Sequence, residues 1–360
     1  MKPPTHLGCS PKLLVFWASL MVGLVSLQVP LFAQLLPINP ATENHPVIDF
    51  PKIPTPEDWR HVRLVRTLTG HTGAVDALVF SPDGKILISG GSHNDGKIKL
   101  WWLKTGKEIE SIRAQRTAVT GLSLSPDGEI LASCGEDAAV NLWDWKTGKY
   151  TRTLLEHSSN ILSLAITPDS QTLITGALDG IKVWNLKTQR PIYTLVRFNN
   201  QTYAIAVRAD GQTLASGGKD TAIKLWNLKT GKLISTLSGH TGPISAMTFT
   251  PDGQYLVSGS YDRTIKIWNL RTGKVAYTLS GHTGQIRSLA INLADGQTLA
   301  STSRDGIRLW NLSTGEPLGL LSGHSDWVES VAFSQDGQML ASGGFDQTIK
   351  IWRTDVPPTP

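Results

Sequence analysis

The sequence contains few of the residues that form disulfide frameworks or reactive thiol sites. Only two cysteines occur among its 360 residues, Cys9 and Cys134. Cys9 lies in an unusual N-terminal segment described below, so Cys134 has no partner in the remaining chain and no intramolecular disulfide framework is expected. Cys134 lies inside the apolar run ILASCG. This position predicts a buried and unreactive thiol.

Recognisable catalytic and metal-binding motifs are also missing. The chain has no H-E-x-x-H, no C-x-x-C and no G-x-S-x-G. The stretch GSHNDGKI, residues 91–98, has the glycine and lysine spacing of a phosphate-binding loop, but Ile98 replaces the required Ser or Thr. A strand pattern, not a helix, follows it, so we interpret this stretch as an enlarged turn. The sequence therefore predicts no catalytic residue, no cofactor and no metal.

Long runs of like charge do not occur. The 34 Lys and Arg residues are scattered among 29 Asp and Glu residues, which leaves a net charge of +5 and a pI near 9.1. Nucleic-acid binding proteins usually concentrate positive charge in blocks or along one face. The even distribution here does not favour a nucleic-acid partner.

The first 58 residues differ from the rest of the chain. Residues 13–33 carry no charge, follow Lys2 and Lys12, and end at Ala33. This pattern predicts a signal peptide, although Leu31 stands where a small residue is preferred. The stretch also reaches the roughly 20 residues that a membrane span requires, so an uncleaved anchor remains open. Either alternative places the rest of the chain outside the cytoplasm. We therefore expect an exported protein, or a membrane-anchored one tethered through residues 13–33.

Proline marks the flanks of the remaining chain. Residues 34–58 contain six prolines, which exclude helix and regular sheet and predict an extended tether. The last residues, 355–360, form a proline-rich tail. The predicted domains are therefore a signal peptide or anchor (1–33), a tether (34–58), a folded unit (59–354) and a tail (355–360).

A period of about 42 residues organises the folded unit. The tryptophan that ends each IKLW-like run recurs seven times, at Trp101, Trp143, Trp184, Trp226, Trp268, Trp310 and Trp352. Each repeat contains four short runs with strand patterning, separated by turns such as SPDG and KTGK. Four short strands per repeat without helices predict the blade of a β-propeller.

The repeats begin and end in the middle of a blade. After Trp352 no residues remain for a fourth strand, whereas the run VRLVRTL, residues 62–68, precedes the first repeat. We predict that residues 62–68 pair with the last blade and close the ring, which removes the open sheet edges that favour aggregation. The predicted fold is all-β, a seven-bladed propeller of four-stranded blades, and we expect it to be monomeric.

These repeats resemble the WD-repeat family. The recurring GH, the Ser or Thr of the second strand, the turn Asp and the Trp match its pattern over residues 60–353. Trp143-Asp144 is the one literal WD pair, four repeats have Trp-Asn, and the first and last have Trp101-Trp102 and Trp352-Arg353. The resemblance implies a propeller whose partners dock on the rim that carries the loops before the first strands.

A histidine and an aspartate recur with the repeat, as His240 and Asp262 do in the fifth. A pair that returns five times serves the fold more simply than it serves catalysis. The family resemblance implies a hydrogen-bonded chain of Trp, Ser or Thr, His and Asp in each of these repeats. Its predicted members are His71, Ser89, Asp95, Trp101; His157, Thr175, Asp179, Trp184; His240, Ser258, Asp262, Trp268; His282, Ser301, Asp305, Trp310; and His324, Ser342, Asp346, Trp352.

Repeats two and four lack this histidine. Gln115 and Phe198 stand at the two positions. We expect these two blades to be weaker or to pack differently.

The rim positions are decorated unevenly. Repeats one to three carry mostly small or acidic residues, including Thr120, at the positions that flank the first strand and precede the turn Asp. Aromatic residues and arginines, which are enriched in binding hot spots, gather in repeats four to seven. The predicted partner-binding residues are Tyr203, Lys219, Tyr261, Gln285, Arg287, Arg304, Trp327, Glu329 and Phe345.

The sequence thus favours a non-catalytic scaffold that binds a protein or peptide partner, with acidic groups expected on that partner. An exported propeller enzyme, either a hydrolase or a lyase, and a carbohydrate- or small-ligand-binding propeller are the alternatives. An enzyme would require non-repeating acid, base or metal residues near the axis, and a ligand binder should repeat its pocket in several blades.

Overall fold

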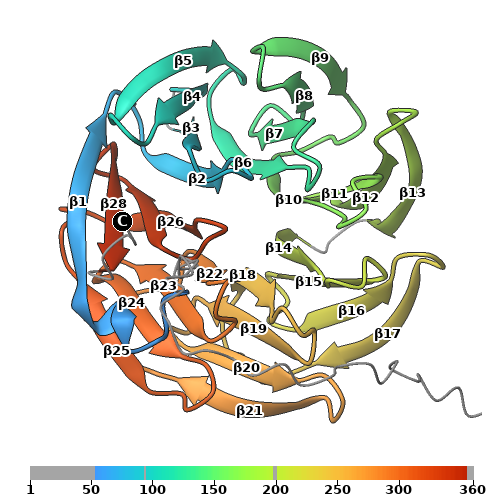
Figure 1. The fold of residues 1–360 in the computed structure, drawn as a ribbon. Coiled ribbons are helices and arrows are strands. Elements are labelled where there is room, and N and C mark those ends of the chain that lie inside the picture. The colour runs from blue at the N-terminus through green and yellow to red at the C-terminus, as the bar shows by residue number, and fades with distance from the viewer. Residues whose placement is uncertain (1–52, 93–94, 198–200, 355–360) are drawn as a thin grey trace, which may run out of the picture. The chain divides into compact units, whose positions relative to one another are not determined.

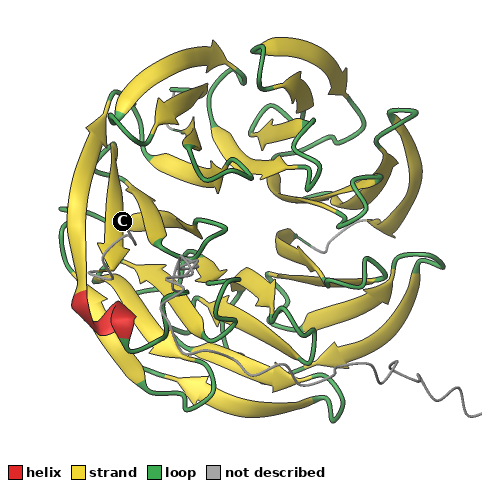
Figure 2. Ribbon diagram, in the orientation of Figure 1, coloured by secondary structure: helices red, strands yellow, loops and turns green. Residues whose placement is uncertain are grey.

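The four strand-forming runs of each repeat fold into an antiparallel sheet, and seven such sheets form a ring (Figure 1). The computed structural model describes residues 53–92, 95–197 and 201–354. Strands account for nearly all of the regular structure in this part of the chain, with one short 3-10 helix beside them (Figure 2). The predicted all-β, seven-bladed propeller with four-stranded blades is therefore confirmed.

Each blade runs from an inner strand near the axis to an outer strand at the periphery (Figure 1). Blades one to four are formed by β2 (Val75–Phe80), β3 (Ile86–Gly91), β4 (Lys97–Trp102), β5 (Lys107–Arg113); β6 (Val119–Leu124), β7 (Leu131–Gly135), β8 (Val140–Asp144), β9 (Lys149–Leu154); β10 (Ile161–Ile166), β11 (Thr172–Ala177), β12 (Gly180–Asn185), β13 (Arg190–Arg197); and β14 (Thr202–Val207), β15 (Thr213–Gly218), β16 (Ile223–Asn227), β17 (Lys232–Leu237).

The last three blades complete the ring. They are formed by β18 (Ile244–Phe249), β19 (Tyr255–Ser260), β20 (Ile265–Asn269), β21 (Lys274–Leu279); β22 (Leu289–Ile291), β23 (Thr298–Ser303), β24 (Gly306–Asn311), β25 (Pro317–Leu321); and β26 (Val328–Phe333), β27 (Met339–Gly344), β28 (Thr348–Thr354), with β1 (Val62–Thr69) as the outer strand.

Burial follows the order of strands within a blade. All five residues of β7 are buried, including Cys134, whereas five of the six residues of β17 are exposed. Second strands consequently read as apolar and small, because blades pack against both of their faces. Burial raises the pKa of the Cys134 thiol to about 12, so this thiol is held in its unreactive form.

β1 closes the ring, in agreement with the predicted closure strand. It pairs antiparallel with β28, and Leu64 lies opposite Trp352. In blade four, Leu233 lies opposite Trp226 in the same way, and both pairings contain a register shift beside this position. The N-terminal strand therefore continues the repeat pattern in register, as if the chain had not been interrupted. The side chain of Ser330 also donates to the carbonyl of Val75, 2.9 Å away, and so links blade seven to blade one.

The N-terminal segment also supplies a core residue that sequence analysis missed. Trp59 lies in the short 3-10 helix η1 (Asp58–His61) and is completely buried among residues of blades six and seven. Six other interblade clusters contain the residue two positions after a repeat tryptophan, namely Leu103, Trp145, Leu186, Leu228, Leu270 and Leu312. Thr354 follows Trp352 at this spacing. Trp59 thus occupies, in the seventh cluster, the role that these apolar residues have elsewhere.

Several sequence predictions concern residues outside the described part of the chain. The predicted signal peptide or anchor at residues 13–33, most of the tether and the tail at 355–360 lie there, so these assignments stay predictions. Within the described ranges, no helix is long and apolar enough to cross a membrane.

Candidate functional site

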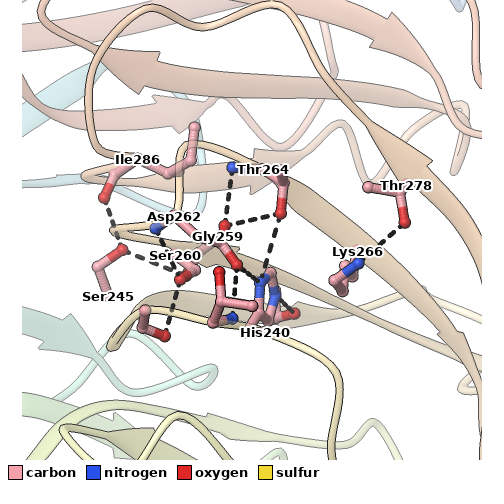
Figure 3. A network of polar contacts seen from close by, with 12 residues as sticks. His240, Ser245, Gly259, Ser260, Asp262, Thr264, Lys266, Thr278 and Ile286 are labelled. Atoms are coloured by element: carbon pink, nitrogen blue, oxygen red, sulfur yellow. Dashed lines mark hydrogen bonds and ion pairs between the residues drawn. The ribbon is translucent and has the colours of Figure 1, made fainter.

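The recurring histidine and aspartate lie in a buried chain of hydrogen bonds. In blade five, the Trp268 indole N–H donates to Ser258 Oγ at 2.8 Å, and Ser258 Oγ lies 2.8 Å from His240 Nε2. His240 Nδ1 lies 2.7 Å from Asp262 Oδ2 (Figure 3). Because a carboxylate only accepts, Nδ1 carries the proton and Nε2 accepts from the serine hydroxyl. Every member of this chain is therefore satisfied with a neutral histidine.

The same chain occurs in four other blades. His71, His157, His282 and His324 each contact their own hydroxyl through Nε2, at 2.7 or 2.8 Å, and their own aspartate through Nδ1. The hydroxyl acceptors are Ser89, Thr175, Ser301 and Ser342, which receive the N–H groups of Trp101, Trp184, Trp310 and Trp352. The partner aspartates are Asp95, Asp179, Asp305 and Asp346.

Electrostatics keep the pairs neutral on histidine and ionised on aspartate. Burial lowers the pKa of His240 and outweighs the opposing effect of Asp262. Burial disfavours the ionised form of Asp262, but hydrogen bonds from Thr264, from the Thr241 backbone N–H and from His240 outweigh it and lower its pKa to about 2. A permanently neutral, buried imidazole whose two nitrogens are occupied has no free valence for a substrate. The geometry therefore gives these pairs a structural role.

Blades two and four hold different networks. In blade two, the Asn141 amide donates to Gln115 Oε1 at 3.1 Å and Thr153 donates to Asn141 Oδ1 at 2.5 Å. In blade four, Trp226 still donates to Ser216, at 2.8 Å, while Asp220 pairs with Lys224. Phe198 lies outside the described residues. The glutamine of blade two thus enters a polar network of its own instead of leaving the position empty.

We expect His240→Ala to lower the free energy of unfolding by about 1–3 kcal/mol, because it leaves Ser258 and Asp262 without their buried partner. Urea unfolding followed by circular dichroism measures this difference. His61→Ala, which removes an exposed histidine, is the control and should change stability by less than about 0.5 kcal/mol. An unchanged unfolding midpoint together with lost partner binding would instead assign His240 a functional role.

The pH dependence gives the same prediction a second readout. The folded-state pKa of His240 lies below its unfolded value of about 6.5, so the unfolded state binds more protons as the pH falls through this region. Stability should therefore decrease on acidification below about pH 6.5. The His240→Ala variant should show a smaller decrease over this window than the wild-type protein.

Four of the predicted partner-binding residues form a continuous stack on the rim. The Tyr203 and Tyr261 rings lie 6.5 Å apart, and the Arg287 guanidinium lies over Tyr261 at 5.7 Å and over Trp327 at 4.7 Å. Arg287 Nη1 also lies 3.3 Å from the Tyr261 hydroxyl. The four residues come from blades four, five, six and seven in turn. We call Tyr203, Tyr261, Arg287, Trp327 and Glu329 the rim arc.

Glu329 sits against the guanidinium of this stack. Its Oε1 lies 3.3 Å from Arg287 Nε, and its side chain is 14% exposed. Burial raises the pKa of Glu329 to about 7, with Arg287 opposing this effect and Asp76 and Asp326 adding to it. Arg287 is consequently engaged inside the protein, which differs from the expectation that it offers its charge to an acidic partner.

The other predicted rim residues stand apart from the stack. Lys219 and Arg304 are exposed, whereas Gln285 and Phe345 are half-buried. Thr120, on the opposite blades, is one of the small rim residues for which the sequence predicts no binding role. Its hydroxyl donates to the Ile161 carbonyl of the next blade at 2.6 Å, and Ser245 makes the same bond to Ile286 (Figure 3). Thr120 therefore stabilises the ring and is unsuitable as a neutral control.

Comparison with known proteins places these observations in a family. The model of the WD domain, G-beta repeat, matches residues 62–101, 106–144, 148–185, 189–227, 231–269, 273–311 and 315–353. Pre-mRNA-processing factor 19 from Bos taurus is 35% identical over 75 residues, which are 21% of this chain and 14% of that protein. Small ribosomal subunit protein RACK1z from Arabidopsis thaliana is 39% identical over 74 residues, 21% of this chain and 22% of its own length.

Ribosome biogenesis protein ERB1 from Yarrowia lipolytica is 34% identical over 96 residues, which cover 24% of this chain and 12% of that protein. The aligned segments thus span less than a quarter of each relative, so these similarities concern the repeats and not the whole proteins. The family model, in contrast, covers seven consecutive segments from residue 62 to residue 353. The chain belongs to the WD40 repeat family.

Proposed function

We propose that this propeller is a non-catalytic scaffold that binds a protein or peptide partner through the rim arc. The observation that carries the proposal is the stack of Tyr203, Tyr261, Arg287 and Trp327 across four successive blades. The scaffold beneath it repeats, whereas these residues do not, so the fold itself does not require them. Membership of the WD40 family, whose relatives named above include ribosomal and splicing proteins, supports a role in protein assemblies.

The physical properties of the rim arc suit protein recognition. Tyrosine and tryptophan bring a large contact area and few rotatable bonds, so little entropy is lost on binding. Their stacking on Arg287 holds them in place before a partner arrives, which reduces the ordering cost of association. Because Arg287 is paired with Glu329, the arc presents mainly aromatic surface. An apolar or aromatic anchor on the partner would therefore contribute more than an acidic group at this rim.

The enzyme alternative has less support. No group of three or more His, Cys, Asp or Glu side chains within the described ranges could hold a metal ion. The one described carboxyl with a pKa raised to about 7, that of Glu329, faces an arginine and two aromatic rings, with no nucleophile among its described partners. The carbohydrate alternative predicts a pocket repeated in several blades, and the rim arc differs from blade to blade.

Truncation of the arc should weaken partner binding. We expect Trp327→Ala and Tyr261→Ala each to lose about 2 kcal/mol of binding free energy, roughly a 30-fold weaker Kd, if they are central anchors. A partner is first captured with the full chain and identified, and isothermal titration then measures the affinity of each variant. Asn160→Ala, on the half-buried rim of blade three, is the matched control. Wild-type affinity of both folded variants would place the interface elsewhere.

A further inference from the structure

A second surface lies where the ring closes, on the boundary between blade seven and blade one. There the outer strand β1 and the neighbouring strand β28 face two turns of blade one and enclose a groove of about 720 Å³. We call it the closure groove. Its lining residues are Arg63, Val65, Arg66, Gly84, Lys85, Trp102, Leu103, Lys104, Met339, Ile351 and Arg353. Its volume lies within the range of natural ligand sites.

The closure groove is strongly basic. Five of its eleven lining residues are Lys or Arg, and none of these described lining residues is acidic. The nearby Asp83 lies 3.6 Å from Lys85 Nζ, but both side chains are more than half exposed, so this pair neutralises little. The whole chain carries only +5, so a concentration of five cations in one groove is a local feature.

Departures from the repeat produce this charge. Lys85 stands where the other six repeats have Glu129, Gln171, Gln212, Gln254, Gln297 and Gln338. Trp102 and Arg353 stand where the other five have Asp144, Asn185, Asn227, Asn269 and Asn311. The two repeats that lack an Asp or Asn at this position are the first and the last, and ring closure makes them neighbours. Three non-repeating residues therefore meet in one groove.

An equivalent groove elsewhere in the ring shows that the fold does not require basic residues at this position. The groove between blades five and six is lined by the corresponding turns and encloses about 340 Å³. Its lining includes Asp252 and Asp295 and contains no Lys or Arg among the described residues. The same architecture thus accommodates an acidic surface between one pair of blades and a basic surface between another.

The departure at Trp102 gives up a local hydrogen bond. In blade four, Asn227 Oδ1 accepts the backbone N–H of Thr230 at 2.9 Å and so caps the turn. In blade one the turn keeps its backbone bond, from Gly106 N to the Trp102 carbonyl at 2.7 Å, but an indole cannot provide the side-chain cap. Residues that break a local rule without a folding benefit are typical of functional sites.

From these observations we propose that the closure groove binds an extended acidic peptide segment of a partner protein. The cations would receive its carboxylates, and Trp102 would contact one of its apolar or aromatic side chains. Val65, Leu103, Met339 and Ile351 give the groove an apolar component, which suits peptide side chains better than a sugar–phosphate backbone. The site is separate from the rim arc and does not depend on it.

The arginines of the groove are already positioned for this role. Arg66 donates to the Thr105 carbonyl of blade one, and Arg353 Nη2 donates to Gln338 Oε1 at 3.2 Å. A guanidinium has five N–H donors in a rigid fork, so one such bond orients the group and leaves donors for a carboxylate. Preorganised charges of this kind lose little entropy when an anionic group binds.

The test uses a fluorescein-labelled peptide that carries several glutamates around a central phenylalanine, and a matched peptide with glutamines in their place. Fluorescence anisotropy with the full chain should show binding of the glutamate peptide that weakens with added salt, and at least about tenfold weaker binding of the glutamine peptide. Equal binding of the two peptides, or no binding of the glutamate peptide at low salt, overturns the proposal.

The key variant replaces each non-repeating residue by one that other repeats carry, as Lys85→Gln, Trp102→Asn and Arg353→Asn together. We expect it to fold and to bind the glutamate peptide at least about tenfold more weakly, with a smaller salt dependence. The charge-matched control, Lys187→Ser with Lys229→Ser, removes two exposed lysines from blades three and four and should bind like wild type. Equal loss in both variants would reduce the effect to net charge and overturn the site.

Three further measurements distinguish the closure groove from misfolding, from a general polyanion site and from the rim arc. Should the triple variant not fold, Lys85→Glu alone, at an exposed turn, should also weaken binding of the glutamate peptide. Stronger binding to a single-stranded oligonucleotide or to phosphatidylserine vesicles, lost in the triple variant, would replace the peptide by another polyanion and overturn the proposal. Trp327→Ala should bind the glutamate peptide normally, so failure of the rim arc and failure of the closure groove are distinguishable.

Discussion

A chain that begins at residue 70 should lose the cooperative unfolding transition of the complete propeller. The truncation removes β1, whose Leu68 packs with Ile349 and Ile351 of β28 and with residues of blade one. It also leaves the backbone groups of β28 unpaired along an open sheet edge, which is a template for aggregation. Blade seven would then lack its outer strand, and the ring would lose the pairing that closes it. We expect a broad transition or precipitation on heating.

Two longer chains separate the contributions of the N-terminal segment. A chain that begins at residue 53 keeps η1 and β1 and should melt as sharply as the full chain. A chain that begins at residue 62 keeps β1 but lacks Trp59, and should melt cooperatively at a lower temperature. Calorimetry and light scattering of the three chains measure both properties. Equally sharp melting of the shortest chain would show that ring closure does not hold the propeller together.

The period of the sequence was sufficient to predict the blades, because each repeat contains its own strand pattern and turn chemistry. The position of Trp226 within its repeat, for example, determines the strand before it and the turn after it. Closure could also be predicted, since an unpaired fourth strand is a gap in a regular count. Local patterns of this kind depend on neighbours in the sequence, so they can be recognised without a structure.

Trp59 shows where the same reasoning failed. The repeats were aligned on the tryptophan that ends the third strand, and no such residue precedes Leu64. Counting backward from the strand pairing would have found it, since Trp59 precedes Leu64 by five positions as Leu228 precedes Leu233. The proline-rich composition directed attention away from this segment, because composition describes an average and Trp59 is a single buried residue.

The rim arc was only partly predictable, for a different reason. Repeat alignment selected Tyr203, Tyr261, Arg287 and Trp327 as rim positions, but alignment contains no information on contacts between blades. The ion pair of Arg287 with Glu329 depends on side-chain conformations across a blade boundary. The meeting of Trp102 and Arg353 in the closure groove likewise follows only after the ring is closed, because these residues are about 250 positions apart in the chain.

Replacement of Trp59 by alanine should destabilise the propeller by about 3–5 kcal/mol, although the residue lies outside every aligned repeat. The side chain is 0% exposed, and its ring meets Phe333 edge to face with centroids 5.0 Å apart. Around it lie Leu318 of blade six and Trp352 of blade seven, among others. Alanine would leave a large cavity between two blades that share only one covalent connection.

Trp59→Phe is the matched variant, and its expected result identifies the cause. Trp59 Nε1 is buried and donates to no acceptor in the described part of the chain, so the indole N–H contributes no hydrogen bond to stability. Phenylalanine keeps most of the apolar volume and removes this unsatisfied donor, so it should cost less than about 1.5 kcal/mol. Urea unfolding of both variants by circular dichroism measures the two values. Similar large losses for alanine and phenylalanine would mean that Trp59 acts through its N–H group, whereas no loss for alanine would remove η1 from the core of the propeller.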